Sequence, residues 1–122
     1  MKSAPKPPKA YEEFIKRYPK LGQAWDLIHA AGIDGPLDDK TVRLVKLGIA
    51  IGAMREGAIH SSVRKALAQG IAPAEIEQVI GLAAGTLGMP STVAVFSWIR
   101  DYLAGGAGDR VQRRRHRRAT LS

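Results

Sequence analysis

The chain of 122 residues contains no cysteine, and this absence excludes several classes of function. Without thiols the chain forms no disulfide framework, holds no metal through thiolates and carries out no thiol redox chemistry of its own. Long hydrophobic runs are also missing. The most apolar stretch, residues 76–99, is interrupted by Gln, Gly and Pro, so we expect no membrane span.

The first ten residues, MKSAPKPPKA, lack the apolar segment of a secretory signal, and we therefore expect a cytoplasmic protein. Three prolines and three lysines in this segment predict a flexible, basic, extended arm over residues 1–9.

The positive charge is confined to the two ends of the chain. Of the formal net charge of +8, residues 1–9 contribute +3 and residues 105–122, which contain RVQRRRHRR, contribute +5. Residues 10–104 hold ten basic and ten acidic side chains and are neutral. The pattern predicts one neutral domain over 10–104 with two basic tails, rather than a basic nucleic-acid-binding domain.

Apolar residues in the body recur at helical spacing, and no two-residue alternation indicates a strand. We predict an all-α fold, with helices over 11–18, 21–32, 40–54, 56–69, 73–87 and 90–103. Asp38 or Asp39 is suited to cap the third helix, Gly70 to end the fourth, and Pro73 to begin the fifth.

Two segments are more apolar than a small domain requires. Residues 42–54 contain so few polar interruptions that we expect their helix to be buried on most of its surface. Residues 79–96 are almost free of charge and rich in Ala and Gly. This second stretch predicts burial against other subunits, the alternative being the central helix of a monomeric bundle.

The densest group of chemically active residues lies in MREGAIHSSVRKAL, residues 54–67. Glu56, His60 and Arg64 are spaced four apart and share one helix face. A carboxylate beside an imidazole can orient it for proton transfer, and an arginine supplies a cation for a carboxylate. The same ladder is common on solvated helices, where each pair contributes only about 0.2–0.5 kcal/mol. Both interpretations stay open.

No histidine pair with a nearby acid has metal-ligand spacing, and no glycine-rich loop follows a strand. We therefore expect neither a metal nor a cofactor.

The body resembles the carboxymuconolactone decarboxylase family, which includes the alkylhydroperoxidase D-like proteins. The resemblance covers roughly residues 37–103 and rests on the order and spacing of several short pieces. These are LxxKTxxL at 37–44, REG at 55–57, RxALxxGI at 64–71, PxEI at 73–76 and GMPSTVA at 88–94. It implies an all-α bundle subunit that assembles as a homotrimer or homohexamer, with the site near subunit contacts.

The resemblance also bears on the site. In the thiol peroxidase branch, a glutamate, two cysteines and a histidine occupy the positions that are Arg43, Arg55, Ala58 and Ser62 here. The loss of all four implies that this chain is not a thiol peroxidase. The decarboxylase branch shares the Arg-Glu-Gly that begins at Arg55, but its histidine also falls at Ser62.

We predict a cofactor-independent decarboxylase or lyase acting on a small carboxylated or lactone-type molecule. Glu56 and His60 are the predicted catalytic acid–base pair, and Arg55, Arg64 and Ser62 the predicted substrate-binding residues. One alternative is a catalytically inactive oligomeric scaffold or binding module that displays its Arg-rich tails. Another is non-specific contact of residues 110–118 with a polyanion; a purely solubilising tail is equally compatible with the composition.

Overall fold

The computed structural model describes residues 9–104, and all of its regular structure is helical. The labelled helices are α1 (Lys9–Arg17), α2 (Pro19–Ile33), α3 (Asp39–Gly52), α4 (Glu56–Ala68) and α5 (Pro73–Leu87). A sixth, which we call the C-terminal helix, covers residues 89–104. The described part of the chain has no strand, which confirms the predicted all-α class. The Arg-rich tail and most of the predicted arm lie outside the described residues.

The helix boundaries follow local chemistry. Pro19 and Pro73 occupy first-turn positions of α2 and α5, where a missing backbone N–H costs no hydrogen bond. Asp38 caps α3, because its Oδ1 accepts a hydrogen bond from the Thr41 backbone N at 2.8 Å. At α5, the Glu75 carboxylate accepts from the Ala72 backbone N at 3.1 Å.

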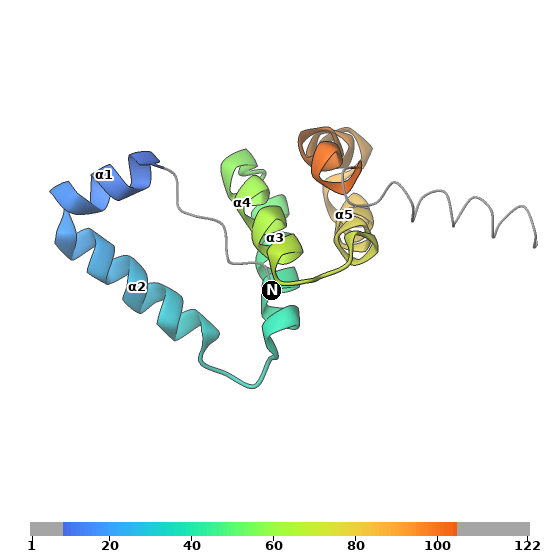
Figure 1. Cartoon of the computed structure of the whole chain (residues 1–122). Helices are drawn as coiled ribbons and strands as arrows, with labels where there is room; N and C mark the ends of the chain where they lie inside the picture. The colour runs from blue at the N-terminus through green and yellow to red at the C-terminus, as the bar shows by residue number, and fades with distance from the viewer. Residues whose placement is uncertain (1–8, 105–122) are drawn as a thin grey trace, which may run out of the picture.

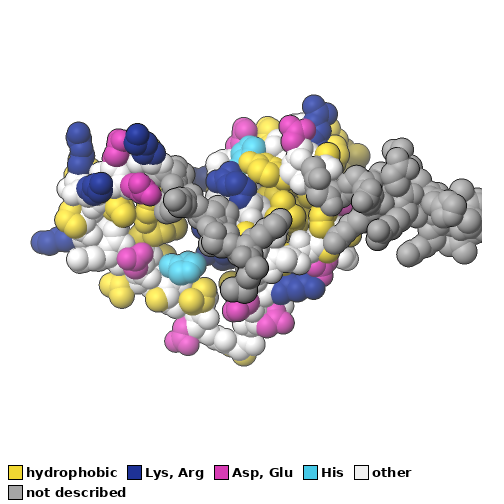
Figure 2. Space-filling model, viewed as in Figure 1, with side chains coloured by type: hydrophobic (Ala, Val, Ile, Leu, Met, Phe, Trp, Pro, Cys, Tyr) yellow, Lys and Arg dark blue, Asp and Glu magenta, His cyan; other side chains and the backbone are white. Residues whose placement is uncertain are grey.

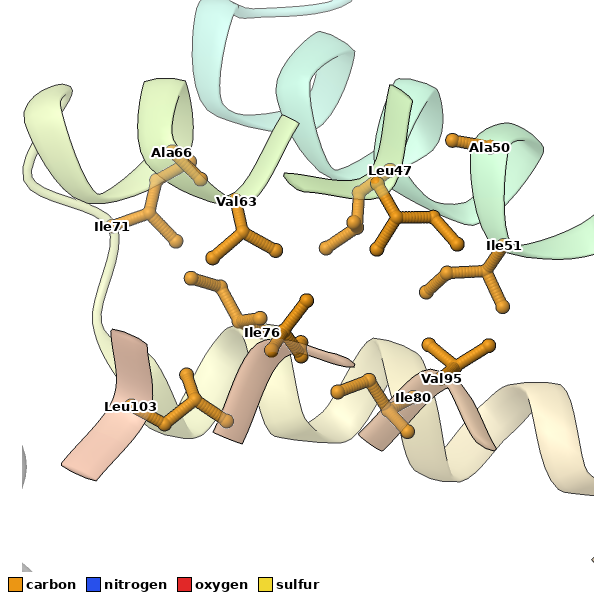
Figure 3. Close-up of a cluster of buried hydrophobic side chains, with 12 residues drawn as sticks. Leu47, Ala50, Ile51, Val63, Ala66, Ile71, Ile76, Ile80, Val95 and Leu103 are labelled. Atoms are coloured by element: carbon orange, nitrogen blue, oxygen red, sulfur yellow. The ribbon is translucent and has the colours of Figure 1, made fainter. Parts of the chain in front are cut away.

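The core lies between two layers of helices (Figure 3). One layer is α3 and α4, and the other is α5 and the C-terminal helix. The fully buried large side chains are Leu47, Ile51, Ile59, Val63, Ile76, Val95 and Ile99. They are contributed by all four helices, so burial of these side chains holds the two layers together.

Helices α1 and α2 form a hairpin that lies to one side of this core (Figure 1). The two helices pack on each other near their junction, where Gly22 of α2 lies against Ile15 of α1. The Phe14 ring of α1 is 5.0 Å from the ring of Tyr18, the residue between the two helices. Neither helix has a buried residue. Hydrophobic side chains therefore lie along the surface of α2 in Figure 2.

The expectation that the third helix is buried on most of its surface is wrong. Only Leu47, Ala50 and Ile51 of α3 are buried, whereas Val45 is 46% and Ile49 67% exposed. The helix packs through one face on α4 and α5, and Ile49 faces an open cavity instead.

The almost uncharged stretch over 79–96 keeps several large side chains exposed in the single chain: Leu82, Met89, Val93 and Phe96. Their burial against other subunits stays a prediction.

None of the described helices combines the length and the apolar character needed to cross a membrane.

Two turns with the same hydrogen-bond pattern lie directly before and after α4. After α4, Gly70 adopts a left-handed backbone with φ of 90°. The Gly70 N–H donates to the Leu67 carbonyl at 3.0 Å, and the Ile71 N–H donates to the Ala66 carbonyl at 3.0 Å. This is the Schellman arrangement that glycine favours. The turn before α4 has the same hydrogen-bond pattern, with Met54 at φ 53° in place of glycine.

Replacement of Gly70 by alanine is predicted to destabilise the fold by about 1 kcal/mol, measured by urea unfolding. An added Cβ meets nothing within 4 Å, so the penalty comes from the left-handed backbone alone. Gly57→Ala, in helical backbone and equally open space, is the control and is predicted to raise stability. Equal effects of the two substitutions would contradict this explanation.

Candidate functional site

Polar side chains lie on two opposite sides of α4. Successive residues of an α-helix are rotated by about 100°, so His60 and Ser62 point in nearly opposite directions. On one side, Ser62 and Lys65 follow Arg55, the residue immediately before the helix, at helical spacing. On the other side lie Glu56, His60 and Arg64. The two groups therefore form separate sites.

The first side lines an open cavity of about 500 Å3 between α3, α4 and Trp25 of α2. Its apolar wall is made by Trp25, Ile49, Ala50, Ala53 and Ala58. Ser61 and Ser62 add two hydroxyl groups, and Ser62 is buried. The cavity thus offers an apolar surface for the body of a small molecule and hydrogen-bonding groups for its polar atoms.

Four cationic residues also line this cavity: Arg43 and Lys46 from α3, Arg55 at the turn, and Lys65 from α4. None of the described residues that line it is acidic. The Arg43 Nε atom is buried and has no hydrogen-bond partner in the described part of the chain. An unpaired, buried guanidinium nitrogen is costly unless a ligand supplies the acceptor.

The electrostatics reflect this crowding of positive charge. Burial lowers the pKa of Arg43 below its ordinary value. Burial and, to a smaller extent, the charge of Arg43 lower the pKa of Lys46. The pKa of Lys65 is lowered first by burial and then by Arg43, Lys46 and Arg64. Any bound anion would relieve the repulsion among these groups.

The opposite side of α4 holds a hydrogen-bonded group that we call the outer network: Glu56, His60, Arg64 and Tyr102. Arg64 Nη1 donates to Tyr102 Oη at 3.2 Å, and Tyr102 Oη lies 2.9 Å from His60 Nδ1. His60 Nε2 lies 3.2 Å from Glu56 Oε2. With neutral His60, a consistent assignment has the Tyr102 hydroxyl donate to Nδ1 and Nε2–H donate to the carboxylate. The network links α4 to the C-terminal helix.

The structure therefore divides the predicted site residues between two places. Arg55 and Ser62 line the cavity. Glu56, His60 and Arg64 come together as their spacing indicated, but none of them is among the residues that line it. The described residues also include no group of three His, Asp or Glu side chains able to hold a metal ion.

Sequence reasoning missed Lys46, Lys65, Trp25 and Tyr102 as members of these sites. A signal existed for the two lysines, because Lys46 lies one turn from Arg43, and Lys65 one turn from Ser62. Nothing in the sequence placed Trp25 over α3 or brought Tyr102 to His60 from 42 residues away.

Tyr102→Phe is predicted to lower the free energy of unfolding by about 1–2 kcal/mol, because His60 and Arg64 lose a part-buried hydrogen-bond partner. Urea unfolding measures the change. Tyr18→Phe removes a hydroxyl from an exposed ring and is the matched control, for which stability should stay nearly constant. Equal stability of the two variants would show that the outer network contributes nothing to the fold.

Lys46→Gln is predicted to raise the melting temperature of the ligand-free protein by a few degrees at neutral pH and low salt, since it removes a charge that is partly buried and, to a smaller extent, repelled by Arg43. Folding lowers the pKa of Lys46, so the cost of its charge to the free energy of unfolding is fully present below the folded-state pKa. It disappears as the pH rises through the ordinary value of 10.5, and the advantage of the variant should shrink accordingly. Lys16→Gln on the exposed surface of α1 is the control. If the melting temperature of Lys46→Gln falls while that of Lys16→Gln stays constant, the Lys46 charge does not destabilise the fold and the explanation is wrong.

Comparison with known families identifies the fold. The model of the carboxymuconolactone decarboxylase family matches residues 19–101, which include α2 to α5 and most of the C-terminal helix. Searches of curated proteins and of solved structures gave no match. The four residues that the sequence resemblance sets at the reactive positions of the thiol branch all line the cavity: Arg43, Arg55, Ala58 and Ser62. With a family match over most of its length, the chain belongs to the carboxymuconolactone decarboxylase family.

Proposed function

We propose that the cavity between α3 and α4 binds a small carboxylated molecule and that the chain acts on it as a cofactor-independent lyase. The observation that carries this proposal is the convergence of four cationic side chains in one cavity whose described lining has no acid. Such a site suits an anion and disfavours a cationic or uncharged ligand.

Arg43 and Arg55 are the proposed carboxylate ligands. A guanidinium group presents donors in a planar fork that matches a carboxylate, and its charge is permanent. The free Nε of Arg43 gives this residue a donor that no described residue uses. Ser62, at the position of the family histidine, supplies a hydroxyl that donates to a second polar atom of the ligand.

The proposed chemistry is proton transfer at carbon. When a C–C bond to a carboxylate breaks, the electron pair stays on the neighbouring carbon, which must then take a proton. Lys46 and Lys65 line the same cavity, and their lowered pKa values bring an ammonium group closer to the range of an effective proton donor. Because the chain has no cysteine, this chemistry replaces the thiol chemistry of the other branch.

The sequence predicts Glu56 and His60 as the catalytic acid–base pair, and our proposal assigns them a different role. In this structure both ring nitrogens of His60 lie within hydrogen-bonding distance of Tyr102 or Glu56, on the opposite side of α4. We therefore place substrate binding and the proton donor in the cavity and assign to the outer network the support of the α4 orientation.

Glutarate is a suitable probe, because it carries two carboxylates on a short apolar body. Arg43→Gln is predicted to weaken glutarate binding by about tenfold to a hundredfold in isothermal titration calorimetry, as expected for loss of a charged hydrogen-bond partner. Arg100→Gln removes an exposed arginine outside the cavity lining and is the control. Unchanged affinity in Arg43→Gln, or equal losses in both variants, would refute the cavity as the binding site.

A further inference from the structure

We propose that Lys65 is an amine nucleophile, which forms an imine with a small β-oxo carboxylate bound in the cavity. This inference rests on the proposed function, since it uses the same cavity and the same carboxylate ligands. It adds a covalent step and a narrower substrate class: acids that carry a ketone.

The position of Lys65 is the first argument. Its side chain lines the cavity together with Arg43, Lys46 and Arg55, next to an apolar wall that includes Ala58. Lys65 itself is exposed at the edge of this open cavity, where a small molecule in the cavity can reach its amine. Neighbouring cations favour the neutral, nucleophilic form of such an amine. A carboxylate held by the two arginines would keep a carbonyl of the same small molecule within the cavity that Lys65 lines.

Lys46 and Lys65 are distinguished by their neighbours. Besides burial, the pKa of Lys46 is lowered by Arg43 alone, whereas that of Lys65 is lowered by Arg43, Lys46 and Arg64. The charges of Arg43, Lys46 and Arg64 each favour the neutral form of Lys65. Lys65 also lies one turn from Ser62 on α4, whereas Lys46 lies one turn from the carboxylate ligand Arg43 on α3. The pair thus provides a free amine and an ammonium group in one cavity.

The proposed steps balance with a solvent proton as the only further reactant. The Lys65 Nζ lone pair attacks the ketone carbon, and the oxygen leaves as water, with one proton from the Lys65 amine and one from the Lys46 ammonium group, to give a protonated imine. This imine accepts the electron pair of the C–C bond when the β-carboxylate leaves as carbon dioxide. Lys46 regains a proton from the solvent and donates it to the enamine carbon, so that each turnover consumes one solvent proton overall. Water then releases the shortened ketone and restores the amine.

Reductive trapping tests this assignment on the full chain. We would incubate the protein with acetonedicarboxylate and cyanoborohydride, which reduces a protonated imine to a stable amine, and map the modified lysines by peptide mass spectrometry. Lys65 is expected to be labelled on the order of ten times faster than Lys16, an exposed lysine of α1. Diethyl ketone, with the same carbon chain and no carboxylate, should give no preference for Lys65.

A variant separates this inference from the proposed function. Lys65→Arg cannot form an imine, so it should lose the selective labelling, while glutarate binding by the native protein tests the carboxylate site separately. Lys16→Arg should keep both the selective labelling and glutarate binding. Glutarate binding by the native protein with uniform labelling of its lysines, or with labelling of Lys46 in place of Lys65, would overturn the imine and leave the carboxylate site standing. Failure of glutarate to bind would overturn the proposed function itself.

Discussion

The packing of α4 against α3 is the constraint on which both polar sites depend. Ile59, Val63 and Ala66 are fully buried along α4, and this stripe fixes how the helix is rotated about its own axis. Once that rotation is set, the residues on either side of the stripe point to different surroundings. Ser62 faces the cavity, and His60 faces the C-terminal helix. A shift of the buried stripe by two residues, a rotation of about 200°, would exchange these environments.

The cationic residues that line the cavity lower the stability of the fold. Four cations lie in one cavity, where burial lowers the pKa of Arg43, Lys46 and Lys65, and repulsion further lowers the pKa of the two lysines. Nothing in the core requires this arrangement, because the buried side chains that join the two helix layers are aliphatic. Local destabilisation that a ligand can relieve is typical of functional sites. The outer network instead stabilises the fold, because its hydrogen bonds link α4 to the C-terminal helix.

The sequence predicted the helices well because their ends depend on local chemistry. Asp38, Gly70 and Pro73 act within a few residues of their own positions, so capping rules suffice for them. Burial was harder to predict. An apolar pattern shows that Ile49 can be buried, but its exposure follows from the α1–α2 hairpin lying away from the core.

The candidate site was predicted in part, for similar reasons. The face shared by Glu56, His60 and Arg64 follows from helical periodicity alone, and the structure brings these residues together. Which face of α4 lines a cavity depends on α3 and α2, and periodicity contains no such information. Arg55 was predicted to bind substrate, whereas Arg43 was noted only as a loss relative to the thiol branch. In the structure they are cationic residues lining one cavity.

The central claim is that ligands bind at the cationic cavity and not at the outer network. The most direct test is an NMR titration of isotopically labelled protein with glutarate, observed through the arginine Nε–H signals and the rings of His60 and Tyr102. The Arg43 Nε–H signal is predicted to shift on binding, because this donor has no partner among the described residues. A titration that moves the His60 and Tyr102 signals and leaves Arg43 unchanged would contradict the claim.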